Sequence, residues 1–298
     1  MTKHFFAAAN TPMGFVNFFE HIMPLEKAKT RYFLKGSSGS GKSTFIKKIA
    51  AEFEAMGVSI EKFHCANDPN SLDALAVPDR GLCIIDATAP HSCDPEIPVA
   101  VDKIIDFAKF LDEKKISRHI DELNSLLREK KQLREKVAEH LTACENNFPA
   151  EENRDTDKWL KYFNQYGTRS SSVTHRKLFL SAITPDGFVS FAENYFKDCE
   201  VYHFCEPSEL KDKARACGIN TESFCCPVAP QRLDYLHLPD LKIVFTGGFF
   251  KPNSAIDAVV ESMRLARAHH AKIEEIYASA MNFEKVSRIA EKIIQKER

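Results

Sequence analysis

The chain has 298 residues, of which 44% are hydrophobic and 28% charged, a composition typical of a globular protein with room for two domains. Its net charge of −1 gives no electrostatic footprint for nucleic acid, and no apolar run approaches the length of a membrane span. Nine scattered cysteines favour reduced thiols, and the N-terminus lacks a secretory apolar region, so we expect a cytoplasmic protein without a membrane span or a nucleic-acid partner.

The first elements predicted along the chain are a turn, a helix and a strand. Residues 11–14, TPMG, carry a turn signal. Residues 15–22 then place apolar side chains at helical spacing, and residues 32–34 predict a short buried strand.

The strand leads into residues 36–44, GSSGSGKST, which match the phosphate-binding pattern G-x-x-x-x-G-K-[ST]. Glycines let the backbone curl so that successive N–H groups point at phosphate oxygens, and the helix predicted to follow aims its positive end at the same anion. Lys42 would reach the β- and γ-phosphates, and the Ser43 hydroxyl would bind Mg²⁺. The residues expected around the phosphates are Gly36, Ser37, Ser38, Gly39, Ser40, Gly41, Lys42, Ser43 and Thr44.

The rest of this site is predicted at the ends of the next two strands. Residues 58–65 predict a strand followed by a loop over 67–70, which contains Asp68. Residues 82–85 form an apolar run that ends at Asp86, where a carboxylate would hold Mg²⁺ directly or through water. The candidate catalytic residues are therefore Lys42, Asp68 and Asp86, and the candidate magnesium ligands are Ser43 and Asp86.

The middle of the chain is charged and helical. Apolar residues recur at 3–4 spacing through 99–146, which predicts one long helix or two antiparallel helices inserted after the third strand. Such an arm is a candidate lid, or a surface for an unidentified protein partner. A linker composition follows, so we expect a nucleotide-binding domain over 1–166, a linker over 167–177 and a second domain over 178–298.

The second domain repeats part of the first. AANTPMGFVNFFEH at 8–21 aligns with SAITPDGFVSFAEN at 181–194, and FHCANDPNSLDALAVPDRGLCIID at 63–86 aligns with FCCPVAPQRLDYLHLPDLKIVFTG at 224–247. The second copy is shorter between these blocks, where the first copy carries its glycine loop. Only the first copy is therefore predicted to hold nucleotide.

The repeat also separates structural residues from functional ones. The Thr-Pro-x-Gly turn occurs in both copies, which indicates a role in the fold. Asp73 recurs as Asp234, so we interpret it as a turn or helix-start residue. Asp68 and Asp86 have no acidic counterpart, which favours a role with the nucleotide.

On residues 11–15, 36–44, 68–73 and 84–86, the chain resembles a family of uncharacterised bacterial predicted ATPases with two tandem P-loop-like halves. The resemblance spans most of the chain and implies ATP binding and hydrolysis, without a particular substrate. With the elements above, it leads us to expect an α/β fold of the P-loop NTPase type. This would have three αβα layers, a mainly parallel sheet, a helical insertion and a second, degenerate unit.

The sequence also limits which nucleotide and which reactions are candidates. No N-K-x-D segment for guanine occurs, so ATP with Mg²⁺ is favoured over GTP. We expect an ATPase coupled to conformational change, while a small-molecule kinase with Asp68 as base and a nucleotide-binding regulatory protein remain open. Arg128 and Arg134 on the helical arm lack clear lid spacing. The sequence does not choose an arginine finger from Arg31, Arg169, Arg176 and Arg215.

Overall fold

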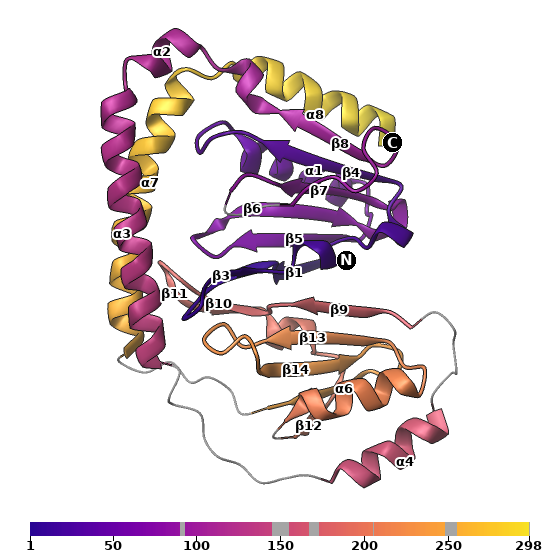
Figure 1. Cartoon of the computed structure of the whole chain (residues 1–298). Coiled ribbons are helices and arrows are strands. Elements are labelled where there is room, and N and C mark those ends of the chain that lie inside the picture. Colours follow the sequence, from indigo (N-terminus) through magenta and orange to yellow (C-terminus); the bar gives the residue numbers. More distant parts are fainter. Residues whose placement is uncertain (90–92, 145–154, 167–172, 205, 248–254, 298) are drawn as a thin grey trace.

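The structure is a computed structural model that describes residues 1–89, 93–144, 155–166, 173–204, 206–247 and 255–297. It is an α/β structure with two mixed sheets, one in each half of the chain (Figure 1). Two long helices run side by side along one flank of both sheets. Within these ranges, no helix combines the length and the apolar character needed to cross a membrane.

The first sheet has six strands in the order β1-β5-β6-β7-β4-β8. They are β1 (Thr2–Phe6), β4 (Thr30–Lys35), β5 (Ile60–Cys65), β6 (Asp68–Val77), β7 (Leu82–Asp86) and β8 (Asp102–Asp106). Neighbouring strands are parallel except at β6, which runs antiparallel to β5 and β7. Because β4 and β7 are parallel neighbours, the loop after β4 and the carboxylate that ends β7 lie at the same edge of the sheet.

The second sheet repeats this pattern without a counterpart of β8. Its order is β12-β15-β14-β13-β9. The strands are β9 (His175–Leu178), β12 (Glu200–His203), β13 (Thr221–Cys225), β14 (Leu233–Leu238) and β15 (Ile243–Thr246). As β6 does in the first sheet, β14 runs antiparallel to both of its neighbours. The predicted internal repeat is therefore confirmed in strand order and direction.

The two halves meet at equivalent positions of the repeat. Phe6 and Phe179 form an antiparallel bridge in which each backbone N–H donates to the other's carbonyl oxygen at 3.0 Å. These residues belong to or follow the edge strands β1 and β9, so the two sheets meet edge to edge at this bridge (Figure 1).

The Thr-Pro-x-Gly segments close equivalent hairpins. They join β2 (Ala8–Thr11) to β3 (Gly14–Asn17) and β10 (Ser181–Thr184) to β11 (Gly187–Ser190). In the first hairpin the threonine hydroxyl donates to the glycine carbonyl at 2.8 Å, and in the second at 2.9 Å. The helix predicted over 15–22 is wrong, because β3 and a 3₁₀ turn, η1 (Phe19–His21), occupy those residues.

Each half receives a helix from the other half of the sequence. The outer face of the first sheet carries α1 (Lys42–Ala55) and α8 (Phe283–Glu297), and that of the second carries α6 (Pro207–Ala216) and α4 (Thr156–Tyr166). Trp159 and Phe163 of α4 pack on Phe245 of the second sheet. The structure thus places the last helix of residues 1–166 on the second sheet, and the last helix of 178–298 on the first.

The connection between the halves is made by α3 (Ile120–Cys144) and α7 (Ala255–Ser279). The start of α3 packs on the end of α7, and the end of α3 on its start, so the two are antiparallel. The helical prediction for 99–146 is wrong at its beginning, where β8 and the 3₁₀ turn η4 (Phe107–Phe110) precede the short α2 (Glu113–Ser117). The antiparallel partner of α3 comes from the far end of the chain.

The face of the first sheet opposite α1 and α8 is covered by short segments. Phe5, Phe33 and Phe63 on this face are fully buried against residues of η1 and of the second half. This arrangement differs from the expected three layers, since η1 and the four-residue α5 (Ala192–Tyr195) stand where a layer of longer helices was expected.

Candidate functional site

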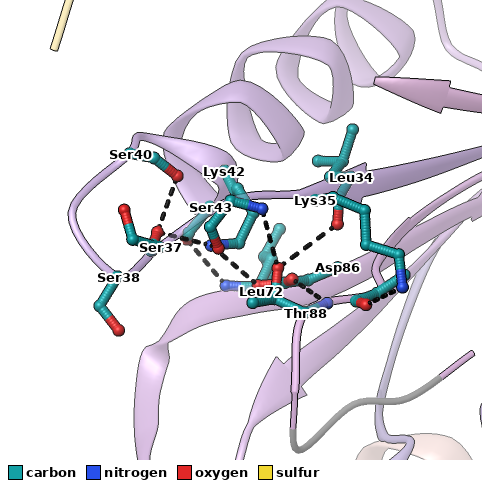
Figure 2. A network of polar contacts seen from close by, with 12 residues as sticks. Leu34, Lys35, Ser37, Ser38, Ser40, Lys42, Ser43, Leu72, Asp86 and Thr88 are labelled. Atoms are coloured by element: carbon teal, nitrogen blue, oxygen red, sulfur yellow. Dashed lines mark hydrogen bonds and ion pairs between the residues drawn. The ribbon is translucent and has the colours of Figure 1, made fainter. Parts of the chain in front are cut away.

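The glycine loop leaves the end of β4 and enters α1 (Figure 2). Gly41 precedes the helix with a left-handed φ of 88°, a conformation that a side chain disfavours. Ser40 closes the loop, because its N–H and its hydroxyl both donate to the Ser37 carbonyl, at 3.3 and 2.8 Å. The first N–H groups of α1 have no partner within the helix, so the positive end of the helix dipole lies at this loop.

Gly39 is one point at which the loop touches α7 of the second half. Its φ is 77°, and a Cβ placed on it would lie 2.3 Å from the carbonyl oxygen of Glu274 on α7. Only glycine allows the α7 backbone to come this close, so the shape of the loop and the position of α7 depend on each other.

Replacing Gly39 by alanine is expected to lower the free energy of unfolding by about 2–4 kcal/mol, because left-handed strain adds to a clash with backbone. Chemical denaturation would measure the loss. Gly57→Ala is the matched control, since Gly57 has a φ of 71° and open space around its Cβ position, and it should lose only about 1 kcal/mol. Equal losses for the two variants would contradict the close contact with α7.

Lys42 lies at the first turn of α1 and is nearly buried, with 8% of its side chain exposed. Its ammonium donates to the carbonyls of Gly36 and Ser37, both at 2.8 Å, and lies 3.7 Å from the carboxylate of Asp86 (Figure 2). Burial lowers the pKa of Lys42, and the charge of Asp86 opposes that shift. Asp86 in turn accepts from the N–H of Thr88 at 3.0 Å. The structure therefore brings the predicted lysine and the predicted carboxylate together.

Ser43 lies beside Lys42, and its hydroxyl oxygen accepts from the N–H of Leu72 on β6 at 3.0 Å. One lone pair of that oxygen stays available for a cation. Ser43 and Asp86 line the same cavity and offer two oxygen ligands, which fits Mg²⁺ because this ion is commonly held by one or two protein oxygens together with phosphates and water. Among the described residues, no three His, Cys, Asp or Glu side chains form a metal cluster.

Asp68 lines the same cavity as Asp86. The predicted loop over 67–70 is wrong in part, because Asp68 is already the first residue of β6. Its carboxylate accepts from the Ser71 hydroxyl at 2.6 Å and lies 3.0 Å from the guanidinium of Arg267 on α7. The interpretation of Asp73 as a turn or helix-start residue is also wrong: it is buried within β6, as Asp234 is within β14.

The cavity that contains these residues has a volume of about 400 Å³. The glycine loop and the start of α1 form one wall, β6 and the turn before it form a second, and α3 and α7 close it. Sequence reasoning set Arg134 aside for lack of lid spacing. It did not find the other polar side chains that the two long helices contribute, which are Lys130, Arg267, His270 and Glu274. Their only common signal is that they are charged or polar, which most exposed helix residues are.

The three described arginines among those considered as fingers do not line this cavity. Arg31 is buried, donating to both carboxylate oxygens of Asp102 at 2.7 and 2.8 Å. Arg176 is committed to Glu61, and Arg215 lies on α6 in the second half. Arg169 lies outside the described residues.

No protein-family model, no curated protein and no solved structure matches the chain.

Proposed function

We propose that the protein is a P-loop NTPase that binds Mg·ATP and hydrolyses it, coupling hydrolysis to a conformational change. The observation that carries the proposal is the buried ammonium of Lys42 at the start of α1, held by two loop carbonyls and 3.7 Å from Asp86. A lysine and a carboxylate at a glycine loop that opens a helix are the parts with which such proteins hold nucleotide phosphates and their metal. This function also agrees with the resemblance to the bacterial predicted ATPases.

In this proposal the loop N–H groups and Lys42 bind the phosphates, and Ser43 and Asp86 hold Mg²⁺. When bound, Mg²⁺ neutralises charge on the β- and γ-phosphates. Lys42 exchanges its bonds to the loop carbonyls for bonds to phosphate oxygens. Ala87 follows Asp86, so a group elsewhere must orient the attacking water. Asp68 is the candidate, because it lines the cavity and its carboxylate is fixed by Ser71 and Arg267.

The coupling to conformational change is supported by the contacts of α7. Arg267 lies 3.0 Å from Asp68 of the first half and 3.2 Å from Asp186 of the second. One turn further back, Arg264 donates to the Pro185 carbonyl at 2.9 Å. A change at the nucleotide therefore reaches the hairpin of the second half through a single helix.

A small-molecule kinase is the second candidate, favoured by the polar part of the cavity beyond the loop. Asn10, Asn67 and Ser71 line this part, and the Asn10 amide donates to the Asn67 carbonyl oxygen at 3.1 Å. These groups could hold an acceptor hydroxyl near Asp68. Transfer of the terminal phosphate to a metabolite pool, instead of to water, would favour the kinase over the ATPase.

The test of the proposed function is steady-state phosphate release from Mg·ATP, with Asp86→Asn as the variant. The Mg²⁺ concentration for half-maximal activity should rise about 10- to 100-fold, because the metal loses a charged ligand. Asp79→Asn is the control, since Asp79 is exposed just before β7 and should behave as wild type. Tight ATP binding without any phosphate release would favour the regulatory protein, and unchanged Mg²⁺ dependence in Asp86→Asn would remove Asp86 from the metal site.

A further inference from the structure

Two cations of α3 face the glycine loop across the cavity. Lys130 and Arg134 are four residues apart, so they lie on the same side of the helix. Both line the cavity that Lys42 and Ser43 line from the other wall. Lys130 is half-buried, and Arg134 is the more exposed of the two.

Lys130 is connected to the glycine loop through His270 of α7. The Lys130 ammonium donates to Nδ1 of His270, and the Ser38 hydroxyl lies 3.5 Å from the same nitrogen. The pKa of His270 is lowered to about 4, first by burial and then by the charges of Lys130, Arg134 and Lys42. The ring is thus neutral, and three cations lie close enough to affect it.

The cavity is lined by five cations and four carboxylates, which are Lys42, Lys47, Lys130, Arg134 and Arg267 against Asp68, Asp73, Asp86 and Glu274. Lys42 is paired with Asp86, and Arg267 with Asp68. Glu274 of α7 contacts the far nitrogen of the His270 ring at 3.5 Å.

Neither of the two α3 cations contacts a carboxylate of the described residues. Lys130 bonds only a neutral ring, and Arg134 makes no hydrogen bond or ion pair with the described part of the chain. Burial and the charge of Arg134 lower the pKa of Lys130 to about 8. Like charges four residues apart repel, so an anion between them and the loop would remove an unfavourable interaction.

We propose that Lys130 and Arg134 bind the terminal phosphate of a nucleotide held on the glycine loop, with Arg134 as an arginine finger supplied by the chain's own α3. The inference rests on the proposed function and adds the residues that distinguish ATP from ADP. In hydrolysis, water forms a bond to the terminal phosphorus, the bond to the β-phosphate oxygen breaks with its electron pair remaining on ADP, and the released proton passes to solvent. The two cations stabilise the negative charge on the transferring group.

The test compares the dissociation constants of a non-hydrolysable Mg·ATP analogue and of Mg·ADP by calorimetry in Arg134→Ala and Lys130→Ala. Each variant should lose about tenfold or more in affinity for the triphosphate, the usual size of one charged hydrogen bond, and stay within about twofold for ADP. Turnover in Arg134→Ala should fall about 10³-fold. Arg134→Lys, which keeps the charge, should recover part of the triphosphate affinity but little of the turnover.

Arg128→Ala is the matched control, because Arg128 is exposed on the same helix outside the cavity. Unchanged ADP affinity shows that a variant is folded and that its loop is intact. If Arg134→Ala and Lys130→Ala weaken both nucleotides alike, or neither, the inference is overturned while the proposed function stands. If the wild-type protein binds neither nucleotide, the proposed function fails and the inference with it.

Discussion

Lys42→Ala is expected to weaken Mg·ATP binding at least about 100-fold, measured by calorimetry. The ammonium lies at the first turn of α1 between the loop carbonyls and Asp86, and alanine would remove the charged bonds to two phosphate groups while leaving Asp86 without its partner. The same loss should appear in unfolding experiments. Mg·ATP at a hundredfold excess over its dissociation constant should raise wild-type stability by about 2.7 kcal/mol and that of the variant by nearly nothing.

Lys48→Ala is the control for this prediction. Lys48 also lies on α1, but it points to α8, where its ammonium donates to Ser287 at 2.6 Å and to Glu291 at 2.7 Å. Its loss should leave nucleotide affinity unchanged. An unaltered affinity in Lys42→Ala itself would refute the nucleotide site, provided that the variant melts as a folded protein.

Arg176→Ala is expected to lower the free energy of unfolding by about 3–5 kcal/mol, the usual cost of leaving a buried charge unpaired. Arg176 on β9 donates to both oxygens of Glu61 on β5, at 2.9 and 2.5 Å, and so joins the two sheets. Its guanidinium also lies over the Phe5 ring, 5.2 Å from the centroid. Urea denaturation would measure the loss.

The control for Arg176→Ala is a variant in an arginine–glutamate ion pair at the surface. Arg288 and Glu284 pair on α8 with 67% and 74% of their side chains exposed, so Arg288→Ala should cost less than about 0.5 kcal/mol. A double-mutant cycle of Arg176→Met with Glu61→Met should show a coupling of at least about 1 kcal/mol. A loss below about 1 kcal/mol for Arg176→Ala would mean that Glu61 regains water and that the pair does not hold the sheets together.

The sequence predicts those parts of the site whose residues lie close together in the chain. The glycine loop, its lysine and the start of α1 are specified by residues 36–45, because each needs only local backbone geometry. Asp86 ends an apolar run, and its place beside Leu34 follows from the parallel pairing of two buried strands. The repeat similarly predicted both Thr-Pro-x-Gly turns, whose hydrogen bonds stay within four residues.

The parts that the sequence does not predict depend on contacts between distant segments. β8 forms where a helix was expected, because Asp102 accepts two bonds from buried Arg31 and others from the N–H groups of Glu96 and Ile97. The spacing of apolar residues over 99–146 does not reveal that ion pair. For the same reason the pairing of α3 with α7, which brings Lys130 and Arg134 over the loop, could not be found from either helix alone.

The crossing of α4 and α8 to opposite sheets has a consequence for synthesis on the ribosome. When the sheet that carries the glycine loop has left the ribosome, the apolar side of α1 that α8 will cover is still exposed to solvent. The cavity then also lacks the wall formed by α7. At typical translation rates this state lasts roughly ten seconds, until residues 255–297 follow. A nascent chain stalled before that point would expose apolar surface to chaperones and proteases, and nucleotide could assist folding only after α7 and α8 have been made.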